Sequence, residues 1–149
     1  MQEIIVKYAA FDKTKPYSLP IRGTEGSAGF DLRTPIDVEL KPHTRLGVDL
    51  NISHECPIGF VGVLSSRSGL ALKNGVRVFF APCWIDSDYR GSIIATMENT
   101  TDETFHFKAG DKIAQIVYVL YFSGEIHEVD YDDLTQTTRG VGGHGSTGK

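Results

Sequence analysis

The sequence predicts an all-β protein, a sandwich or barrel of short strands with one short helix. Short apolar or alternating segments, such as residues 45–52 and 112–122, recur between turns rich in proline and glycine. Only residues 70–75 have the composition of a helix, and Gly75 is a natural end for it. A chain of 149 residues, 40% of them hydrophobic, can bury one core, so we expect one domain.

The expected strands follow one another closely along the chain. In chain order they are residues 2–8, 30–32, 36–40, 45–52, 57–64, 103–108, 112–122 and 125–129. We also expect residues 81–94 to form a β-hairpin, because apolar residues lie on both sides of a polar tip. The strand at 112–122 is apolar apart from Gln115, which predicts cover on both faces and indicates a subunit interface.

Charge and cysteine content limit the partners and the compartment. The chain has 15 basic and 19 acidic side chains and a net charge of −4, which argues against broad binding of nucleic acid. Cys56 and Cys83 have no metal-ligand spacing, so we expect free thiols in a reducing compartment. No apolar run is long enough to cross a membrane, and the first residues lack a signal-peptide pattern. We expect a soluble intracellular protein of the cytoplasm or nucleus.

The tip of the expected hairpin carries a candidate general base. Asp86 and Asp88 lie one residue apart, followed by Tyr89, and strand alternation would put both carboxylates on one face. A carboxylate beside an aromatic ring suits proton transfer next to a sugar or a base. The alternative is an ordinary solvated turn, since Asp, Ser and Gly are common turn residues.

Three segments could hold phosphate. Arg67, Ser68 and Gly69 offer a guanidinium, a hydroxyl and an open backbone amide at the start of the helix. Residues 139–148, half of them glycine, repeat this chemistry. Gln115 is a lone amide in an apolar strand and needs a partner. The alternatives are a helix-capping serine, a disordered tail and an internal partner for the amide. No segment matches a P-loop, and the five histidines have no zinc spacing.

In their order and spacing these segments resemble the trimeric dUTPase family, the dUTP nucleotidohydrolases. The resemblance covers nearly the whole chain, and the second, third and fifth motifs are the most specific. The five motifs are residues 28–32 (AGFDL), 67–71 (RSGLA), 85–91 (IDSDYRG), 110–115 (GDKIAQ) and 139–148 (RGVGGHGSTG).

The resemblance implies a fold and an activity. It implies a jelly-roll β-barrel over residues 1–135 and a flexible glycine-rich arm over 136–149 that closes the active site of a neighbouring subunit. It also implies a homotrimer with shared active sites that hydrolyses dUTP to dUMP and pyrophosphate with Mg²⁺.

The resemblance also implies roles for single residues. Asp86 would activate the water that attacks the α-phosphorus, and Tyr89 would pack under the deoxyribose. The implied base-binding positions are Cys83, Ile85, Ile94 and His144, and the implied phosphate-binding positions are Arg67, Ser68, Gly69, Gln115, Arg139, Gly145, Ser146 and Thr147. The triphosphate oxygens would hold Mg²⁺, with Asp31 supporting it through water.

The chain departs from the usual family pattern around the base. His144 replaces the phenylalanine that stacks on uracil, Cys83 replaces a glycine, and Phe80 stands where some members have asparagine. These departures leave open a nucleotide-binding or regulatory protein with weak or no turnover. A second alternative is dCTP deaminase, which shares the fold but needs a glutamate where this chain has Thr96; Glu98 lies two residues further on.

Overall fold

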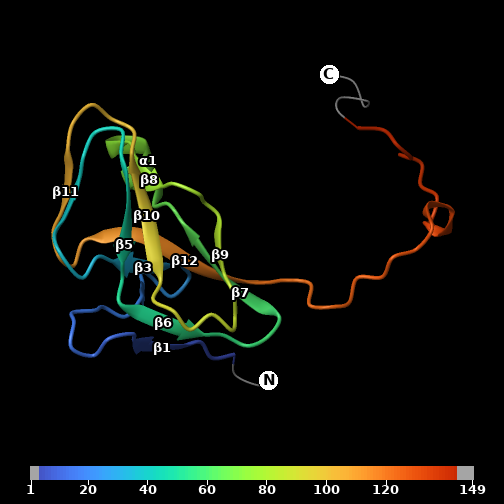
Figure 1. Ribbon diagram of the computed structural model, residues 1–149, viewed down its shortest axis with the longest axis horizontal. Coiled ribbons are helices and arrows are strands. Elements are labelled where there is room, and N and C mark those ends of the chain that lie inside the picture. Colours follow the sequence, from blue (N-terminus) through green and yellow to red (C-terminus); the bar gives the residue numbers. More distant parts are fainter. Residues whose placement is uncertain (1–3, 144–149) are drawn as a thin grey trace.

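The structure, a computed structural model, describes residues 4–143 and is an all-β barrel of jelly-roll type with one short helix (Figure 1). The elements are β1 Lys7–Ala10, β2 Ile21–Arg22, β3 Phe30–Arg33, β4 Val38–Leu40, β5 Arg45–Asp49, β6 Ile52–Glu55, β7 Phe60–Ser65, α1 Ser68–Asn74, β8 Val76–Val78, β9 Cys83–Ile85, β10 Ile94–Asn99, β11 Phe105–Phe107, β12 Lys112–Leu120 and the 3₁₀ turn η1 Tyr131–Asp133.

Four antiparallel sheets enclose the core. The largest has the order β2-β3-β12-β7-β9, the second β5-β10-β8, and β1 pairs with β6 and β11 with β4. Apolar side chains from all of these layers meet in one cluster, which includes Leu32, Leu40, Val48, Ile52, Leu64, Val76, Ile93, Met97, Phe107 and Ile116. The predicted fold class is therefore confirmed, and one hydrophobic core accounts for it.

Strand β12 is the centre of the largest sheet. It pairs with β3 on one side and with β7 on the other. Ile113, Ala114 and Ile116 are buried, whereas Val117 to Val119 are half-buried and Leu120 is exposed. Within one chain, therefore, only the first half of this apolar strand is covered as its sequence predicts.

Helix α1 agrees with the prediction for residues 70–75 but begins two residues earlier. It ends at Gly75, whose φ of 63° is left-handed and whose N–H donates to the Leu70 carbonyl. Arg67 occupies the N-cap position without a side-chain hydrogen bond to the helix. The interpretation of Ser68 as a helix cap is therefore wrong.

The expected strand over residues 45–52 is divided in two at Asn51. Asn51 has a left-handed φ of 54°, so the chain leaves β5 and begins β6 in a new direction. The amide of Asn51 donates to the Asp12 carbonyl at 2.9 Å, and its oxygen accepts from the Asp12 N–H at 2.8 Å. Asparagine tolerates this backbone conformation, and the two bonds stabilise it.

The predicted β-hairpin over residues 81–94 is wrong, because its two arms lie in different sheets. β9 pairs with β7, whereas β10 pairs with β5 and β8. Residues 86–93 cross from one sheet to the other. The alternation also ends at Ile85, since the Tyr89 N–H turns back to the Asp86 carbonyl at 3.2 Å. Asp86 and Asp88 thus lie on a turn and not on one strand face.

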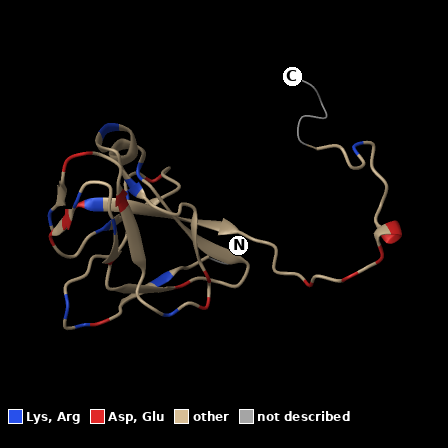
Figure 2. Ribbon diagram, turned by 45° about the horizontal axis from the view of Figure 1, so that its top comes forward, with Lys and Arg blue, Asp and Glu red and all other residues tan. Residues whose placement is uncertain are grey.

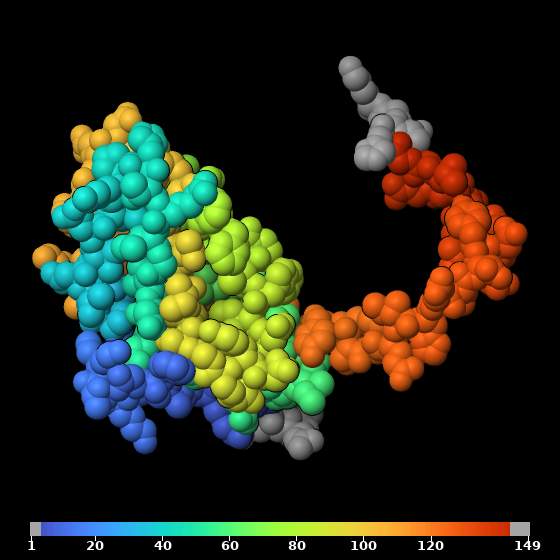
Figure 3. Space-filling model, in the orientation of Figure 1, coloured from blue at the N-terminus to red at the C-terminus, as the bar shows by residue number. Residues whose placement is uncertain are grey.

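Beyond β12 the chain leaves the barrel (Figures 1 and 3). Residues 121–143 are exposed except Gly142, and the expected strand at 125–129 does not form. With no neighbouring strand to pair with, this segment forms the short 3₁₀ turn η1 and a hydrogen-bonded turn at residues 137–142. No helix in the described part of the chain is long and apolar enough to cross a membrane. On the face shown in Figure 2, basic and acidic residues are interspersed over the barrel.

Candidate active site

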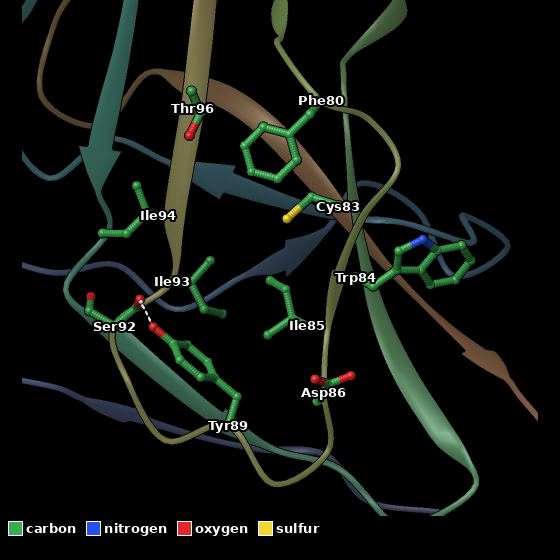
Figure 4. Close-up of a pocket in the computed structure, with 10 residues that line it drawn as sticks. All are labelled: Phe80, Cys83, Trp84, Ile85, Asp86, Tyr89, Ser92, Ile93, Ile94 and Thr96. Atoms are coloured by element: carbon green, nitrogen blue, oxygen red, sulfur yellow. Dashed lines mark hydrogen bonds between the residues drawn. The ribbon is translucent and has the colours of Figure 1, made fainter. Parts of the chain in front are cut away.

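A cavity of about 230 Å³ lies between β9 and β10, where the two sheets separate (Figure 4). Most of its wall is apolar, and it is open to the surface. Phe80 and Thr96 lie at one end and Asp86 and Tyr89 at the other. The lining residues are Phe80, Cys83, Trp84, Ile85, Asp86, Tyr89, Ser92, Ile93, Ile94 and Thr96. Four of the residues predicted to touch the nucleoside or the attacking water (Cys83, Ile85, Tyr89 and Ile94) are thus brought together with Asp86.

The cavity exists because β9 and β10 are not paired with each other. β9 is the last strand of its sheet, so half of its backbone N–H and C=O groups point away from β7. Such groups can read the edge of a base by hydrogen bonding. Cys83 lies in ordinary strand pairing with Leu64, and Figure 4 shows its sulfur directed into the cavity. Left-handed φ is found at His43 and Asn51 among the described non-glycine residues, so Cys83 needs no such conformation.

Tyr89 is held across one end of the cavity by two features. Its hydroxyl donates to the Ser92 carbonyl at 3.1 Å, as the dashed line in Figure 4 shows. A side chain at Gly91 would overlap the tyrosine ring, so only glycine leaves room for the ring here. The hydroxyl of Ser92 in turn donates to the carboxylate of Asp49 on β5.

Asp86 lies at the rim of the cavity with an exposed side chain. Its backbone carbonyl, by contrast, accepts a hydrogen bond of 3.0 Å from the ring of His54, which is only 2% exposed. The carboxylate can therefore reach water while the backbone that carries it is fixed from beneath. Asp88 is absent from this cavity and lines the adjoining groove beside Trp84 and Tyr121.

Strand β6 supports the whole loop that carries Asp86. The Ser53 hydroxyl donates to the carbonyls of Arg90 and Gly91 at 3.0 and 3.1 Å. Arg90 donates to the His54 carbonyl at 3.3 Å and to the Ser87 carbonyl at 2.8 Å. Ser53 and His54 belong to none of the motifs found in the sequence. The signal was the alternation of Ile52, His54 and Cys56, which are all buried.

A second set of predicted residues gathers around β3, β7 and β12. Gln115 on β12 lies opposite Asp31 on β3 and opposite Ser65 on β7. Arg67 comes two residues after the end of β7, and its Nε lies 3.2 Å from Asp31 Oδ1. The Gln115 amide donates to the Ser66 carbonyl at 3.0 Å, so its expected internal partner is found.

Two cations neutralise Asp31 in this arrangement. Besides Arg67, Lys112 places its Nζ 2.6 Å from Asp31 Oδ2. Ser68 and Gly69, in the first turn of α1, are exposed next to this pair. A basic depression of about 350 Å³ lies here, lined by Arg33, Arg67, Leu70, Phe105, His106, Phe107, Asp111 and Lys112. It shares no lining residue with the cavity between β9 and β10.

The predicted arm residues lie only in part within the described chain. Arg139 is exposed, and its Nε donates to the Gly142 carbonyl at 2.8 Å, while Gly140 has a left-handed φ of 49°. These bonds form a local turn of the arm. His144, Gly145, Ser146 and Thr147 lie outside the described residues.

Two further observations concern metals and thiols. Over residues 4–143, no three His, Cys, Asp or Glu side chains lie close enough together to bind a metal ion. Cys56 is a buried free thiol and Cys83 a half-buried one, and burial raises the pKa of both. The expectation that they are unpaired is confirmed.

Glu98, the candidate acid of a deaminase, is committed elsewhere. Its carboxylate bridges Arg45 on β5 at 3.0 Å and Arg77 on β8 at 2.8 Å. The hydrogen bonds from Arg77 and Arg45 hold the pKa of Glu98 below its usual value. Glu98 does not line the cavity, whereas Thr96 does.

The fold and the site together define the class as a jelly-roll β-barrel with a small, mostly apolar cavity and a separate depression lined by cationic side chains. Comparison with known proteins gives the family. The sequence profile of the dUTPase family matches residues 15–148. The chain therefore belongs to the dUTPase family.

Relatives in this family span nearly the same length. A deoxyuridine 5'-triphosphate nucleotidohydrolase of Desulfitobacterium hafniense is 41% identical, and the alignment covers 99% of both chains. The enzyme of the same name from Nautilia profundicola is also 41% identical, over 88% of this chain and 91% of that one.

Solved structures show the same fold. The dUTPase of Staphylococcus bacteriophage 80alpha with dUPNHPP superimposes with a TM-score of 0.84 at 23% identity, covering 97% of this chain and 99% of that one. The dUTPase of Streptococcus mutans superimposes with a TM-score of 0.72 at 26% identity, covering 79% of this chain and 98% of that one. The dUTPase of phage phi11, described with a structural Mg(II) ion, gives 0.77 at 21% identity, covering 87% and 99%.

Proposed function

We propose that this protein is a dUTP diphosphatase that hydrolyses dUTP to dUMP and pyrophosphate with Mg²⁺. The observation that carries the proposal is the exposed carboxylate of Asp86 at the rim of a base-sized cavity, in a chain of the dUTPase family. The curated relatives with 41% identity are named for this reaction.

The nucleoside would occupy the cavity between β9 and β10. The free backbone edge at Cys83 and Ile85, with Ile94 opposite, would bind the uracil. The ring of Tyr89, fixed by Ser92 and by the space at Gly91, would pack against the deoxyribose and leave no room for a 2′-hydroxyl. His144 would cover the base from the arm.

Asp86 would act as the general base. A water molecule within reach of its carboxylate loses a proton to Asp86 as its oxygen forms a bond to the α-phosphorus. The bond from that phosphorus to the bridging oxygen of the β-phosphate breaks, and pyrophosphate leaves with the electron pair. The fixed backbone of Asp86 keeps the carboxylate in place, so little entropy is lost in the step.

The triphosphate would bind to Arg67, Ser68, Gly69 and Gln115, with Arg139, Gly145, Ser146 and Thr147 completing the contacts from the arm. Arg67 would exchange its contact with Asp31 for phosphate oxygens, since a guanidinium can form two parallel (bidentate) hydrogen bonds to a phosphate group.

The residues present fit a magnesium ion held mainly by the substrate. The described chain offers no protein cage, and Asp31 already has two cationic partners. When bound, Mg²⁺ would neutralise charge on the triphosphate, with Asp31 supporting it through water.

The active site would be shared between the subunits of a homotrimer. In the described part of one chain the cavity and the cationic depression have no lining residue in common, and Arg139 donates to the Gly142 carbonyl of its own turn. Large apolar side chains on the outer surface, among them Ile58 at 84% and Leu120 at 75% exposure, would be covered by assembly. In these terms residues 1–135 are the barrel domain, and residues 136–149 are the arm that closes a neighbour's site.

A product assay tests the proposal. Purified protein with Mg²⁺ is given dUTP, dTTP, dCTP and UTP separately, and the products are resolved by ion-exchange chromatography. We expect dUMP and pyrophosphate from dUTP alone. A uracil nucleotide formed from dCTP would indicate a deaminase, which Thr96 and the bridged Glu98 disfavour. Binding of dUTP without product would indicate a regulatory nucleotide-binding protein.

A further inference from the structure

A chain of hydrogen bonds runs from the N-terminal strand through the barrel to Asp86. The hydroxyl of Tyr8 on β1 lies 2.6 Å from that of Tyr118 on β12. The Tyr118 hydroxyl lies 2.8 Å from Nδ1 of His54 on β6, and His54 Nε2 lies 3.0 Å from the Asp86 carbonyl oxygen. Three strands that are distant in sequence therefore converge on the backbone of the proposed general base.

The Asp86 carbonyl oxygen, at the end of this series of hydrogen bonds, determines which group donates in each of them. A carbonyl oxygen can only accept, so His54 must carry a proton on Nε2. In a neutral ring Nδ1 is then an acceptor, and Tyr118 must donate to it. The remaining lone pair of Tyr118 accepts from Tyr8. Burial lowers the pKa of His54, in keeping with the neutral ring.

We propose that His54 is a positioning residue for the reaction: its Nε2–H fixes the backbone of Asp86, and the Tyr118 hydroxyl holds the ring by donating to Nδ1. The inference rests on the proposed dUTP hydrolysis. His54 itself touches neither substrate nor water, because it lies beneath the loop and is 2% exposed. No motif of the sequence analysis includes it.

The geometry explains why a histidine is needed at this place. The bond from His54 reaches the first residue after β9, where no neighbouring strand is left to hold the carbonyl of Asp86. The imidazole fills the space against Gly62, where an added Cβ would lie 3.2 Å from the ring, and it spans two partners at once. An aliphatic side chain would fill the space but leave the carbonyl without its donor.

The first test compares His54→Leu with His54→Gln, using the full-length protein. His54→Leu removes the donor, and we expect kcat for dUTP to fall by about 10- to 100-fold, as for a small misplacement of a reacting group. KM should change by less than about twofold, because the carboxylate is displaced and not the binding groups. His54→Gln keeps an N–H donor and should recover most of the lost kcat.

The matched control is Tyr8→Phe. This variant removes the hydrogen bond between the hydroxyls of Tyr8 and Tyr118 and leaves the bond from His54 to Asp86 intact. We expect a kcat close to that of the unaltered protein. Melting temperature and mass by light scattering are measured for every variant. An equal loss of kcat in Tyr8→Phe and His54→Leu would overturn the proposal. It would show that kcat responds to any change in the buried hydrogen-bond network and not to the bond between His54 and Asp86.

A second measurement does not depend on activity or on the folding of His54→Leu. Nitrogen-15 NMR of the unaltered protein should show His54 as the Nε2–H tautomer, and Tyr118→Phe should keep that tautomer, because the Asp86 carbonyl can only accept. An Nδ1–H tautomer in the unaltered protein would overturn the proposal. Absence of dUTP hydrolysis in the unaltered protein would refute the proposed function. Hydrolysis by the unaltered protein together with an unchanged kcat in His54→Leu would refute only the positioning role of His54.

Discussion

The side-chain oxygen of Gln115 lies 2.9 Å from the place that a Cβ would occupy at Gly29. The two residues lie on neighbouring segments, since Gln115 pairs with Asp31 two residues after Gly29. Glycine at position 29 therefore leaves room for the side-chain amide of Gln115, which is proposed to meet phosphate.

Gly29→Ala should displace this amide. We expect KM for dUTP to rise by about tenfold, the effect of losing one hydrogen bond to a charged group, with a smaller change in kcat. Steady-state assays measure both constants. Gly26→Ala is the control, because an added Cβ there meets nothing within 4 Å. Equal KM values for the two variants would contradict the role given to Gln115.

Asp86→Asn tests the general base. The amide cannot take a proton from water, so kcat should fall by about 10²- to 10⁴-fold. The fold and the cavity wall are unchanged, and a non-hydrolysable dUTP analogue should bind with nearly the original Kd in a calorimetric titration. Undiminished pyrophosphate release by this variant would refute the assignment of Asp86.

Gly91→Ala tests the position of the Tyr89 ring. The new methyl group would overlap the ring and push it away from the sugar, so the preference for dUTP over UTP should fall by about tenfold. The ratio of kcat/KM for the two nucleotides measures this. Tyr89→Phe keeps the ring and loses only the bond to Ser92, and it should keep the preference. A loss in Tyr89→Phe alone would assign selectivity to the hydroxyl.

The buried His54 predicts a dependence of stability on pH. Burial is the main cause that lowers its pKa from 6.5, and the positive charge of Arg90 adds to it, so below that value the unfolded chain binds a proton that the folded chain does not. The free energy of unfolding should therefore fall as pH drops below about 6.5, by at most about 1.4 kcal/mol per pH unit per site. Of the titratable or charged residues, Tyr118 bonds to the ring with its hydroxyl, Asp86 with its backbone carbonyl, Tyr8 lies with its ring centroid 6.3 Å away, and Arg90 acts through its charge.

Denaturant unfolding at a series of pH values measures this slope. Glutamine does not titrate. For His54→Gln the free energy of unfolding should therefore depend less steeply on pH between pH 5 and pH 7, by at most about 1.4 kcal/mol per pH unit. Glu55 does not interfere in this range, because its pKa is held low by Lys7. Parallel curves for both proteins would show that His54 titrates alike in the folded and unfolded states.

Removing residues 139–149 tests the arm. Residues 121–143 are exposed and add almost nothing to the core, so the melting temperature should change by only about 2 °C or less. Activity should be nearly lost, because Arg139, His144, Gly145, Ser146 and Thr147 are removed together. Arg139→Ala in the full chain should give a smaller loss. Unfolding of the shortened protein would mean that the arm has a structural role.

Much of this protein can be predicted from local sequence. Gly75 ends α1 as expected, because a glycine in the left-handed conformation is a local effect that no distant residue changes. The strand at Lys112–Leu120 and the all-β class follow from apolar pattern and turn residues in the same way. The residues proposed to carry the chemistry, from Asp31 to Gln115, can be named from the sequence because each motif is contiguous in the chain.

Strand partners were decided by the tertiary structure. Residues 81–94 have the pattern of a hairpin, yet β9 pairs with β7 and β10 with β5 and β8, because in this arrangement apolar side chains of both arms, such as Ile85 and Ala95, are buried in the common core. That choice opens the cavity next to Asp86. It also brings His54 beneath Asp86 across 32 residues of sequence, a contact that depends on how β6 packs and that no local pattern contains.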